Sequence, residues 1–467
     1  MSSQDFLNGR VTLHSGDCLD VLKSLPDNSL DSCVTDPPYG LKFMGRDWDA
    51  ADNIAFRCEL WAGVLRVLKP GGHLVAFGAT RCAHRMVVAI EDAGFEIRDQ
   101  LSWIFGAGFP KSLDVSKAID KAAGAEREAV GTREYAGDHI QRSSLDKLAP
   151  PIGTFVRTQD DRIITAPATD AAKQWEGFGT ALKPAHEPIC LARKPLSEKT
   201  VAANVLKWGT GAINIDGCRI GDEQTVTMRN GDSGGNSAYG RDERVFSRVN
   251  PPGRFPANIC HDGSPEVLAA FPLTAASSDA VRVNKVKTQF GFGDGKEDGR
   301  LSSGFADNGG SAARFFYSAK ADSDDRLGSR HPTVKPVDLM RWLVRMITPP
   351  GGTTLDMFAG TGTTGEAAYR EGFNAVLIER EPEYQADIAR RMGLVLAGPN
   401  GRAHAAMKAR LNGVEDHGPL FAEPASQPAS QPASQPANTR TAGARANSLS
   451  PSDQSHHRTN RNEAVNP

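Results

Sequence analysis

Apolar and polar residues follow a repeating strand-and-helix pattern over residues 11–110. The runs LDSCV (30–34) and HLVAFG (73–78) are short, largely apolar segments, which are typical of buried strands. Between them, IAFRCELWAGVLRVLKPGG (54–72) has helical apolar spacing and closes with Pro-Gly-Gly, a helix stop signal. A helix over CAHRMVVAIEDAG and a strand over FEIRDQLSWIF follow. The alternation predicts an α/β fold with a parallel sheet and helices on its faces.

The pattern changes between residues 111 and 330. Residues 111–182 are polar, helix-leaning at first and then loop-like, and KPAHEPICLARKPL (183–196) contains one further strand. From about 197 to 330 the chain is rich in Gly, Asn, Asp, Ser and Arg, which predicts a loop-dominated region. Long irregular segments of this kind in a compact enzyme are usually functional or disordered.

The strand-and-helix pattern returns at residue 331. HPTVKPVDLMRWLVRMITPPGG predicts a loop and a helix, and TTLDMFAGTGTTGEAAYREGFNAVLIERE (353–381) predicts strand, glycine turn, helix and strand. A helix over PEYQADIARRMGLVL follows. Later, PASQPASQPASQPA repeats every four residues and cannot build a core, so we predict a disordered tail over residues 415–467.

Composition narrows the class of protein. The chain has 467 residues, 39% hydrophobic and 24% charged, with a formal net charge of -2, which is ordinary for a soluble globular protein and offers no global basic field for nucleic acid. We see no apolar run long enough for a bilayer and no charged-then-apolar leader at Met1, so we expect a cytoplasmic protein without membrane contact. The seven cysteines are scattered without a C-x-x-C pair, which favours reduced thiols over disulfides or a metal site.

The first candidate site is the glycine turn LDMFAGTGTTGEAA (355–368). Gly360 and Gly362 let the backbone pass close to a ligand, and the following helix N-terminus offers free N–H groups. Glu379 ends the next predicted strand, where an acid typically binds ribose hydroxyls. Because the turn lacks G-K-[ST], the pattern favours a nucleoside cofactor over a P-loop nucleotide. A tight turn without a ligand remains the alternative.

The second candidate site is VTDPPYG (34–40). Asp36 follows a predicted strand at its carboxyl end, where open α/β sheets place ligands. Pro37 and Pro38 stiffen the backbone and remove two N–H donors, so their carbonyls can face a ligand. Tyr39 offers a stacking face. These four residues predict a catalytic slot for a flat ring that carries an exocyclic amine.

Such a slot suits one reaction. An exocyclic amine on a nucleobase is a poor nucleophile, because its lone pair is delocalised into the ring. Asp36 and the Pro37 carbonyl can each accept one of the two amine hydrogens. This frees the lone pair for in-line attack on a sulfonium methyl. Asp36 also stabilises the positive charge that develops on nitrogen, which lowers the barrier.

These motifs together resemble the beta class of amino-methylating DNA methyltransferases, which act on adenine N6 or cytosine N4. In that class the catalytic motif precedes the target-recognition region, and the cofactor motif comes last. Four blocks match in kind and order: SGDCLDVLKSLPDNSLDSCVTDPPY, HEPICLARKPL, HPTVKPVDLM and FAGTGTT. The resemblance covers roughly residues 11–110 and 183–395, and the chain is similar to solitary adenine-specific enzymes of phages and prophages.

The resemblance implies a doubly wound, Rossmann-like methyltransferase sheet that is permuted, with its catalytic half first. We expect the catalytic half at 1–110, an insertion and closing strand at 111–196, the target-recognition region at 197–330, the cofactor half at 331–400 and the tail at 415–467. It also implies S-adenosylmethionine as cofactor. The cofactor residues that it implies are Asp17 and Cys18 at the adenine, Phe358 near the adenine or sulfonium, Ala359, Gly360, Gly362, Thr363 and Thr364 around the methionine part, Glu379 at the ribose, Thr333 and Lys335 at the carboxylate, and Asp36 facing the methyl.

The implied partner is double-stranded DNA, and the target base must be flipped out to reach the slot. We expect the loop at 45–53 to close over the base or the DNA, and we expect a homodimer by analogy with the class. The candidate DNA contacts are Lys111, Arg229, Arg241, Arg244, Arg248 and Arg254. Acids balance most of these cations, so a solvated loop is the competing interpretation.

Several functions remain open at this stage. Asp36 as the first residue of the motif favours adenine over cytosine N4. An RNA methyltransferase and a non-catalytic DNA-binding protein are weaker alternatives. A C5-cytosine enzyme would need a cysteine nucleophile, usually after proline, and the sequence has no Pro-Cys pair. Restriction protection and gene regulation are equally compatible with these motifs.

Overall fold

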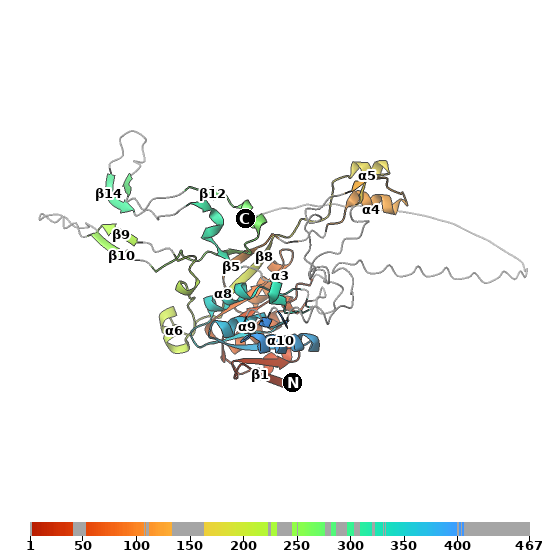
Figure 1. Cartoon of the computed structure of the whole chain (residues 1–467). Helices are drawn as coiled ribbons and strands as arrows, with labels where there is room; N and C mark the ends of the chain where they lie inside the picture. The colour runs from red at the N-terminus through yellow and green to blue at the C-terminus, as the bar shows by residue number, and fades with distance from the viewer. Residues whose placement is uncertain are drawn as a thin grey trace, which may run out of the picture. The chain divides into compact units, whose positions relative to one another are not determined.

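The computed structural model places most of the two predicted α/β halves (Figure 1). It describes residues 2–40, 53–106, 108, 112–132, 163–222, 226–230, 245–249, 251–275, 282–285, 297–302, 309–319, 323–329, 331, 333–398, 401–402 and 404–405. For the strand residues 226–230, 245–249, 282–285 and 297–302 it describes the backbone alone. The predicted tail at 415–467 and residues 45–52 of the predicted loop lie outside the described residues.

The described strands form one ten-stranded sheet, in which the two ends of the α/β pattern interleave. In spatial order these strands are β1 (Ser2–Phe6), β2 (Val11–Ser15), β18 (Asn374–Glu379), β17 (Thr353–Asp356), β3 (Leu30–Thr35), β4 (Leu68–Phe77), β8 (His186–Arg193), β5 (Glu96–Ile104), β11 (Ile259–His261) and β16 (Tyr317–Ser318). The strands β2, β18, β17, β3 and β4 are mutually parallel, so their carboxyl ends meet at one edge.

The alternation of strands and helices predicted a parallel sheet, but the observed sheet is mixed. Strand β8 runs antiparallel to both β4 and β5, and β1 runs antiparallel to β2. Strand β8 follows the long insertion, so it enters the sheet without the helical crossover that a parallel neighbour requires.

Helices cover both faces of the sheet. One apolar cluster contains residues of α8 (Val337–Ile347), α9 (Thr363–Arg370) and α10 (Pro382–Leu394), which Figure 1 shows together in cyan and blue. The other contains residues of α1 (Cys18–Ser24), α2 (Cys58–Val67) and α3 (Ala83–Asp92).

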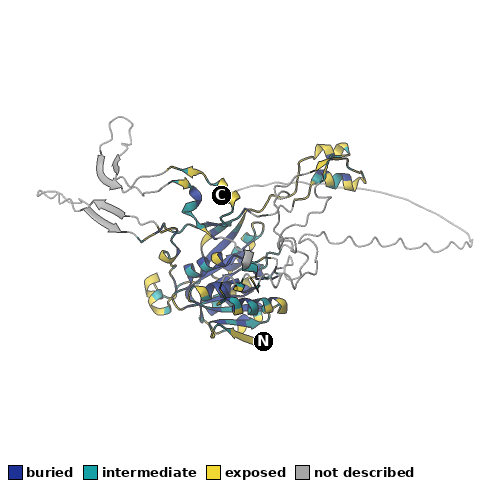
Figure 2. Cartoon of the chain, viewed as in Figure 1, coloured by how far each residue is buried: buried dark blue, intermediate teal, exposed yellow. Residues whose placement is uncertain are grey.

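Successive side chains along a strand point to opposite faces of the sheet, so each strand contributes residues to both clusters. Val34 and Val75 point into the first cluster, and their neighbours Cys33 and Leu74 point into the second. All four side chains are fully buried, and Figure 2 shows the buried residues concentrated in the sheet and the helices beside it. The run of apolar residues in these strands is therefore explained by a sheet that is covered on both faces.

The region predicted to be loop-dominated contributes to the sheet and its cover. Within 197–330, β11 and β16 extend the sheet, and α6 (Val201–Trp208) lies against β4. The buried Asn204 amide donates to the carbonyls of Pro70 and Thr210, both at 2.8 Å. Pro70 belongs to β4, so the Pro-Gly-Gly sequence continues directly into a strand after the helix ends at Val67.

The remaining described elements form small units outside the large sheet. They are the strand pairs β6 (Ala129–Thr132) with β7 (Ile163–Thr165), β9 (Val226–Asn230) with β10 (Val245–Val249), β12 (Leu273–Thr274) with β15 (Gly310–Ser311) and β13 (Arg282–Lys285) with β14 (Glu297–Ser302), the helices α4 (Val115–Ala122), α5 (Asp170–Gln174) and α7 (Pro265–Ala270), and the 3-10 turns η3 (Ile54–Phe56), η5 (Asp216–Cys218), η6 (Ala312–Phe315) and η7 (Ser323–Arg326). None of the helices in the described ranges has the length and apolar character that a bilayer span requires.

Candidate active site

A cavity of about 1310 Å³ lies at the carboxyl ends of the parallel strands. Its walls come from both ends of the sequence, because β3 lies directly beside β17 in the sheet. The predicted site residues that line this cavity are Asp17, Cys18, Asp36, Pro37, Pro38, Tyr39, Thr333, Lys335, Phe358, Ala359, Gly360, Thr363, Thr364 and Glu379. The structure thus brings the two predicted sites into one space.

Gly362 is the predicted cofactor residue that does not line the cavity. It caps the N-terminus of α9 in the left-handed region, with a φ of 78°. A Cβ at this position would lie 3.1 Å from Cγ1 of Ile388 in α10, so glycine allows the turn and α10 to pack closely.

The glycine turn is held by the carboxylate of Glu379. The backbone N–H of Gly360 donates to Glu379 Oε2 at 2.8 Å, and that of Glu381 donates to Oε1 at 2.9 Å. Burial raises the pKa of Glu379 to about 7, although these N–H donors favour the carboxylate. Each oxygen keeps a lone pair for a ligand hydroxyl.

The His331 ring leaves little space for a side chain at Gly360. Gly360 has a φ of 51°, and a Cβ there would lie 3.2 Å from Nε2 of His331. The His331 ring packs edge-on against Tyr384 at 4.5 Å and lines the cavity. His331 therefore forms part of the turn's wall, although the sequence patterns had not indicated it.

Asp17 and Cys18 also line the cavity, at the start of α1, which follows the strand β2 beside β18. Asp17 accepts a hydrogen bond from the N–H of Leu19 at 2.9 Å and so caps the helix. Burial raises the pKa of the Cys18 thiol to about 12, which keeps it neutral. Both the cap role and the cavity role of Asp17 are compatible with this geometry.

Asp356, the last residue of β17, connects the glycine turn to β3. Its carboxylate accepts hydrogen bonds from Thr35 Oγ1 at 2.8 Å, Thr364 Oγ1 at 2.5 Å and the N–H of Phe358 at 3.1 Å. Burial raises the pKa of Asp356 to about 6 against the effect of these donors. Its place at the end of a predicted strand, two residues before the FAGTGTT block, was the sequence signal that could have found it.

The predicted catalytic motif forms a hydrogen-bonded unit. The hydroxyl of Tyr39 donates to Asp36 Oδ1 at 2.7 Å, which fixes the carboxylate relative to the ring. Burial, with Asp36 and Glu187 nearby, holds the pKa of Tyr39 well above its usual range, so the hydroxyl stays protonated. Tyr39 was predicted as a stacking face, and the structure adds this orienting contact.

Lys335 lies inside the same unit. Its ammonium is 2.9 Å from Asp36 Oδ2 and 3.0 Å from Glu187 Oε2, and it donates to the Tyr39 oxygen at 3.2 Å. Burial opposes the charge on Lys335, but Asp36 and Glu187 outweigh it and raise its pKa. These three contacts engage all three ammonium donors. The predicted role of Lys335 at a cofactor carboxylate stays a prediction, and its contacts favour a role beside Asp36.

Glu187 is a cavity residue that the sequence patterns had not singled out. It is the second residue of β8 and lies within the HEPICLARKPL block. Burial raises its pKa, while the Lys335 ammonium opposes that rise. An acid within a predicted buried strand was the available signal, but only the fold shows that β8 begins at this cavity.

Of the six residues predicted to contact DNA, the structure describes the side chain of Arg254 alone. Arg254 pairs through its backbone with Ile220, and its guanidinium lies 4.9 Å from the Phe315 ring centroid. Arg229 and Arg248 lie in β9 and β10, where the backbone alone is described. The side chains of these two residues, together with Lys111, Arg241 and Arg244, lie outside the described residues.

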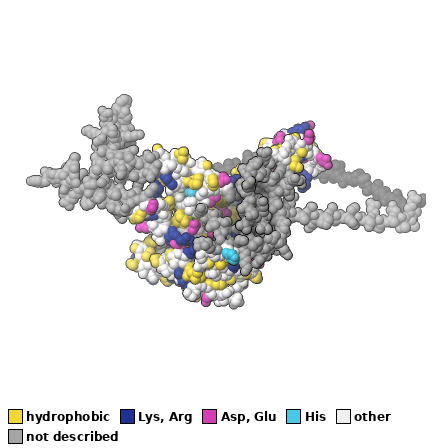
Figure 3. Space-filling view, viewed as in Figure 1, with side chains coloured by type: hydrophobic (Ala, Val, Ile, Leu, Met, Phe, Trp, Pro, Cys, Tyr) yellow, Lys and Arg dark blue, Asp and Glu magenta, His cyan; other side chains and the backbone are white. Residues whose placement is uncertain are grey.

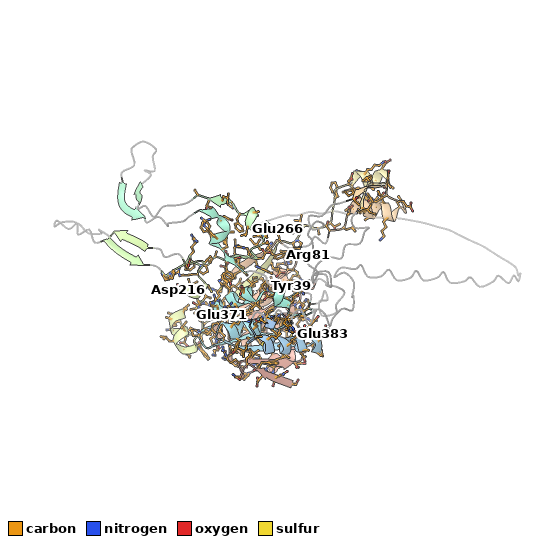
Figure 4. The ribbon with its side chains drawn as sticks, in the orientation of Figure 1. Tyr39, Arg81, Asp216, Glu266, Glu371 and Glu383 are labelled. Carbon is orange, nitrogen blue, oxygen red and sulfur yellow. The ribbon has the colours of Figure 1, made fainter. Side chains whose placement is uncertain are left out.

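Other cations do line the cavity, namely Arg57, Arg81, Lys183 and Arg380. Figure 4 marks Arg81 together with Tyr39. Lys183 donates to the carbonyl of Gly106 at 2.5 Å. On the face that Figure 3 shows, Lys and Arg side chains are interspersed with acidic ones. Sequence reasoning missed these cations because nothing in their local pattern marks them.

Comparison with known proteins identifies the family of the chain. A family model described as DNA methylase, for N6 and N4 enzymes, matches residues 30–390. The Type II methyltransferase M.HindIII of Haemophilus influenzae is 24% identical over 242 residues, which is 43% of this chain and 64% of that protein. M.HinfI, also of Haemophilus influenzae, is 31% identical over 117 residues, which is 21% of this chain and 32% of that protein. The chain thus spans less than two thirds of the length of these relatives.

A solved structure of PvuII DNA methyltransferase (cytosine-N4-specific) is 14% identical, with a TM-score of 0.39, and the match covers 86% of this chain and 93% of that one. The family model spans well over half of the chain, from the catalytic strand to the last helix that packs on the sheet. The chain therefore belongs to the N6/N4 amino-methylating DNA methylase family.

Proposed function

We propose that this protein transfers a methyl group from S-adenosylmethionine to the N6 amine of an adenine that is flipped out of duplex DNA. The observation that carries this proposal is the shared cavity of the catalytic motif and the glycine turn. The hydrogen bond from Thr35 to Asp356 fixes the ends of β3 and β17 together, so the two walls keep one spacing.

The cofactor wall fits the nucleoside and amino-acid parts of S-adenosylmethionine. Glu379 offers carboxylate oxygens at the end of β18 for ribose hydroxyls, and Asp17 and Phe358 flank the space for an adenine. Gly360 leaves the backbone open to close approach. The bound cofactor would supply an electrophilic methyl on a sulfonium, and the chain would supply its orientation.

The substrate wall supplies the polarity that an aromatic amine needs. Asp36 and the carbonyl of Pro37 would accept the two amine hydrogens, while Tyr39 fixes the carboxylate through its hydroxyl. As the nitrogen becomes positive, Asp36 stabilises it more strongly than the neutral amine. One proton then leaves the methylated nitrogen to water or to Asp36, so no covalent intermediate with the protein is needed.

The choice of adenine rests on Asp36 as the first residue of the motif. Cytosine N4 is the second candidate, since the family model covers both amines. The same slot would accept a cytosine amine with similar contacts, so the proposal for the base rests on the motif resemblance. Action on duplex DNA and a homodimeric state are likewise proposals that the described residues leave open.

The test is methyl transfer from tritiated S-adenosylmethionine to genomic DNA that was amplified in vitro and so carries every sequence without modification. The modified nucleosides are then identified after digestion. We expect N6-methyldeoxyadenosine. N4-methyldeoxycytidine would move the assignment to cytosine, label in RNA alone would move it to RNA, and DNA binding without any transfer would contradict an enzymatic role.

A further inference from the structure

Asp36, the acid of the catalytic motif, lies against a buried positive charge. The Lys335 ammonium is 2.9 Å from Asp36 Oδ2, and the Lys335 side chain is only 6% exposed. Its Nζ also lies 4.8 Å from the Phe77 ring centroid and 5.6 Å from that of Tyr39. Because little water reaches this ammonium, it acts on Asp36 at short range with weak screening.

This contact conflicts with the chemistry proposed for Asp36. An isolated pair of Asp36 and Lys335 has a net charge of zero. A neutral pair stabilises a developing positive charge on a base amine far less than a carboxylate alone does. The site therefore needs a further negative charge close to Lys335.

Glu187 supplies that charge from a fixed position. Its Oε2 lies 3.0 Å from Lys335 Nζ and 3.4 Å from the Tyr39 oxygen. Glu187 is paired with Trp103 in the antiparallel ladder between β8 and β5, and the N–H of Gly78 donates to the carbonyl of the next residue, Pro188, at 2.9 Å. The ladder holds the backbone on both sides, so the carboxylate is presented to Lys335 by the sheet.

We propose that Glu187 is a positioning residue that balances Lys335, so that Asp36 acts on the amine of the target base as part of a cluster with a net charge of minus one. This inference rests on the proposed methyl transfer and adds a residue to it. Lys335 then has a structural purpose: its ammonium lets two carboxylates lie close together, which they would not do without a cation between them.

The test compares kcat of Glu187→Gln, Lys335→Met and the double variant, at saturating DNA and cofactor. Glu187→Gln leaves Asp36 against an unbalanced ammonium, and we expect kcat to fall about 10²-fold, as on losing one electrostatic contact to a transition state. The double variant again leaves one net negative charge. We expect it to be about tenfold faster than Glu187→Gln, a coupling of ordinary size for side chains in contact.

Lys335→Met alone leaves Asp36 and Glu187 to share a proton, so we expect a smaller loss than in Glu187→Gln. Cofactor dissociation constants and melting temperatures of each variant separate charge effects from lost binding or folding. Glu371→Gln is the matched control, because Glu371 (marked in Figure 4) also joins two cations, Arg341 and Arg345, but does not line the cavity. It should lower stability and leave kcat unchanged.

A double variant no faster than Glu187→Gln would overturn the charge-balance role while leaving the methyl transfer intact. An equal kcat in Glu187→Gln and wild type would do the same. If the wild-type protein transfers no methyl group to any nucleic acid, the proposed function and this inference fall together, so the two failures are distinguishable.

Discussion

The two walls of the cavity are built in different ways. On the cofactor wall, the glycine turn is held by backbone N–H groups that donate to Glu379 and Asp356, two buried acids with raised pKa values. On the substrate wall, charged side chains from distant segments, Asp36, Glu187 and Lys335, hold one another. The first wall is a local backbone cradle, and the second is a long-range electrostatic cluster. Substitutions should therefore affect binding on one wall and chemistry on the other.

The largest expected effect is on the substrate wall. Asp36→Ala removes the acceptor for the base amine, and we expect kcat to fall by about 10³-fold or to background. The dissociation constant for S-adenosylmethionine should change little, because the cofactor wall is intact. Single-turnover methyl transfer and calorimetric cofactor titration measure the two quantities. Turnover close to that of wild type would remove Asp36 from the mechanism.

The pH dependence of the free energy of unfolding should report the ionisation of Glu379 on the cofactor wall. Burial raises the pKa of Glu379 from its ordinary value to about 7, so the folded protein binds its proton more tightly than the unfolded chain does. The associated stability is present below the ordinary pKa and is lost as the pH rises through about 7, on the order of 3 kcal/mol in total.

Glu379→Gln should flatten this part of the curve between pH 5 and about 7.5, as measured by urea unfolding at several pH values. All other titrating groups are present in both proteins, so the difference between the two curves reports Glu379 together with its coupling to Asp356. Parallel curves would show that the carboxyl titrates normally in the folded protein.

Loss of the ribose acceptor should weaken cofactor binding by a smaller amount. We expect Glu379→Ala to reduce the binding free energy of S-adenosylmethionine by about 1–3 kcal/mol, which is the usual value of a hydrogen bond to a charged group. At saturating cofactor, kcat should remain near that of wild type. An unchanged dissociation constant would place the ribose at another residue.

The smallest effect concerns the shape of the turn. Gly360→Ala forces a left-handed alanine and a Cβ 3.2 Å from His331, and we expect about tenfold weaker cofactor binding. Gly372→Ala is the matched control, since Gly372 also has a positive φ, of 88°, but has nothing within 4 Å of its Cβ position. The control should lower the melting temperature without changing cofactor affinity. Equal loss of affinity in both variants would indicate a general effect of strain.

The same contrast explains what the sequence could predict. The glycine turn, Glu379 and the DPPY motif lie within short segments, so their residue types and spacing carry the information. The contacts of Lys335 with Asp36 and Glu187 join segments more than a hundred residues apart, and no local pattern records which side chains meet. Glu187 was missed for that reason, whereas Asp356 lies within the glycine-turn segment itself, where its position was a local signal.

The fold shows a similar division. The buried strands and amphipathic helices of the two α/β halves followed from periodicity, because each buries its own apolar face. The antiparallel direction of β8 and the addition of β11 and β16 depend on pairing across long insertions. Strands of two or three residues such as these last two have too few positions for a periodic signal.

The most direct test of the shared cavity is a crystal structure of the protein with S-adenosylmethionine bound. The account predicts the ribose hydroxyls at the carboxylate of Glu379 and the sulfonium methyl pointing across the cavity toward Asp36. A cofactor bound elsewhere, or one whose methyl faces away from Asp36 with protein between them, would contradict it.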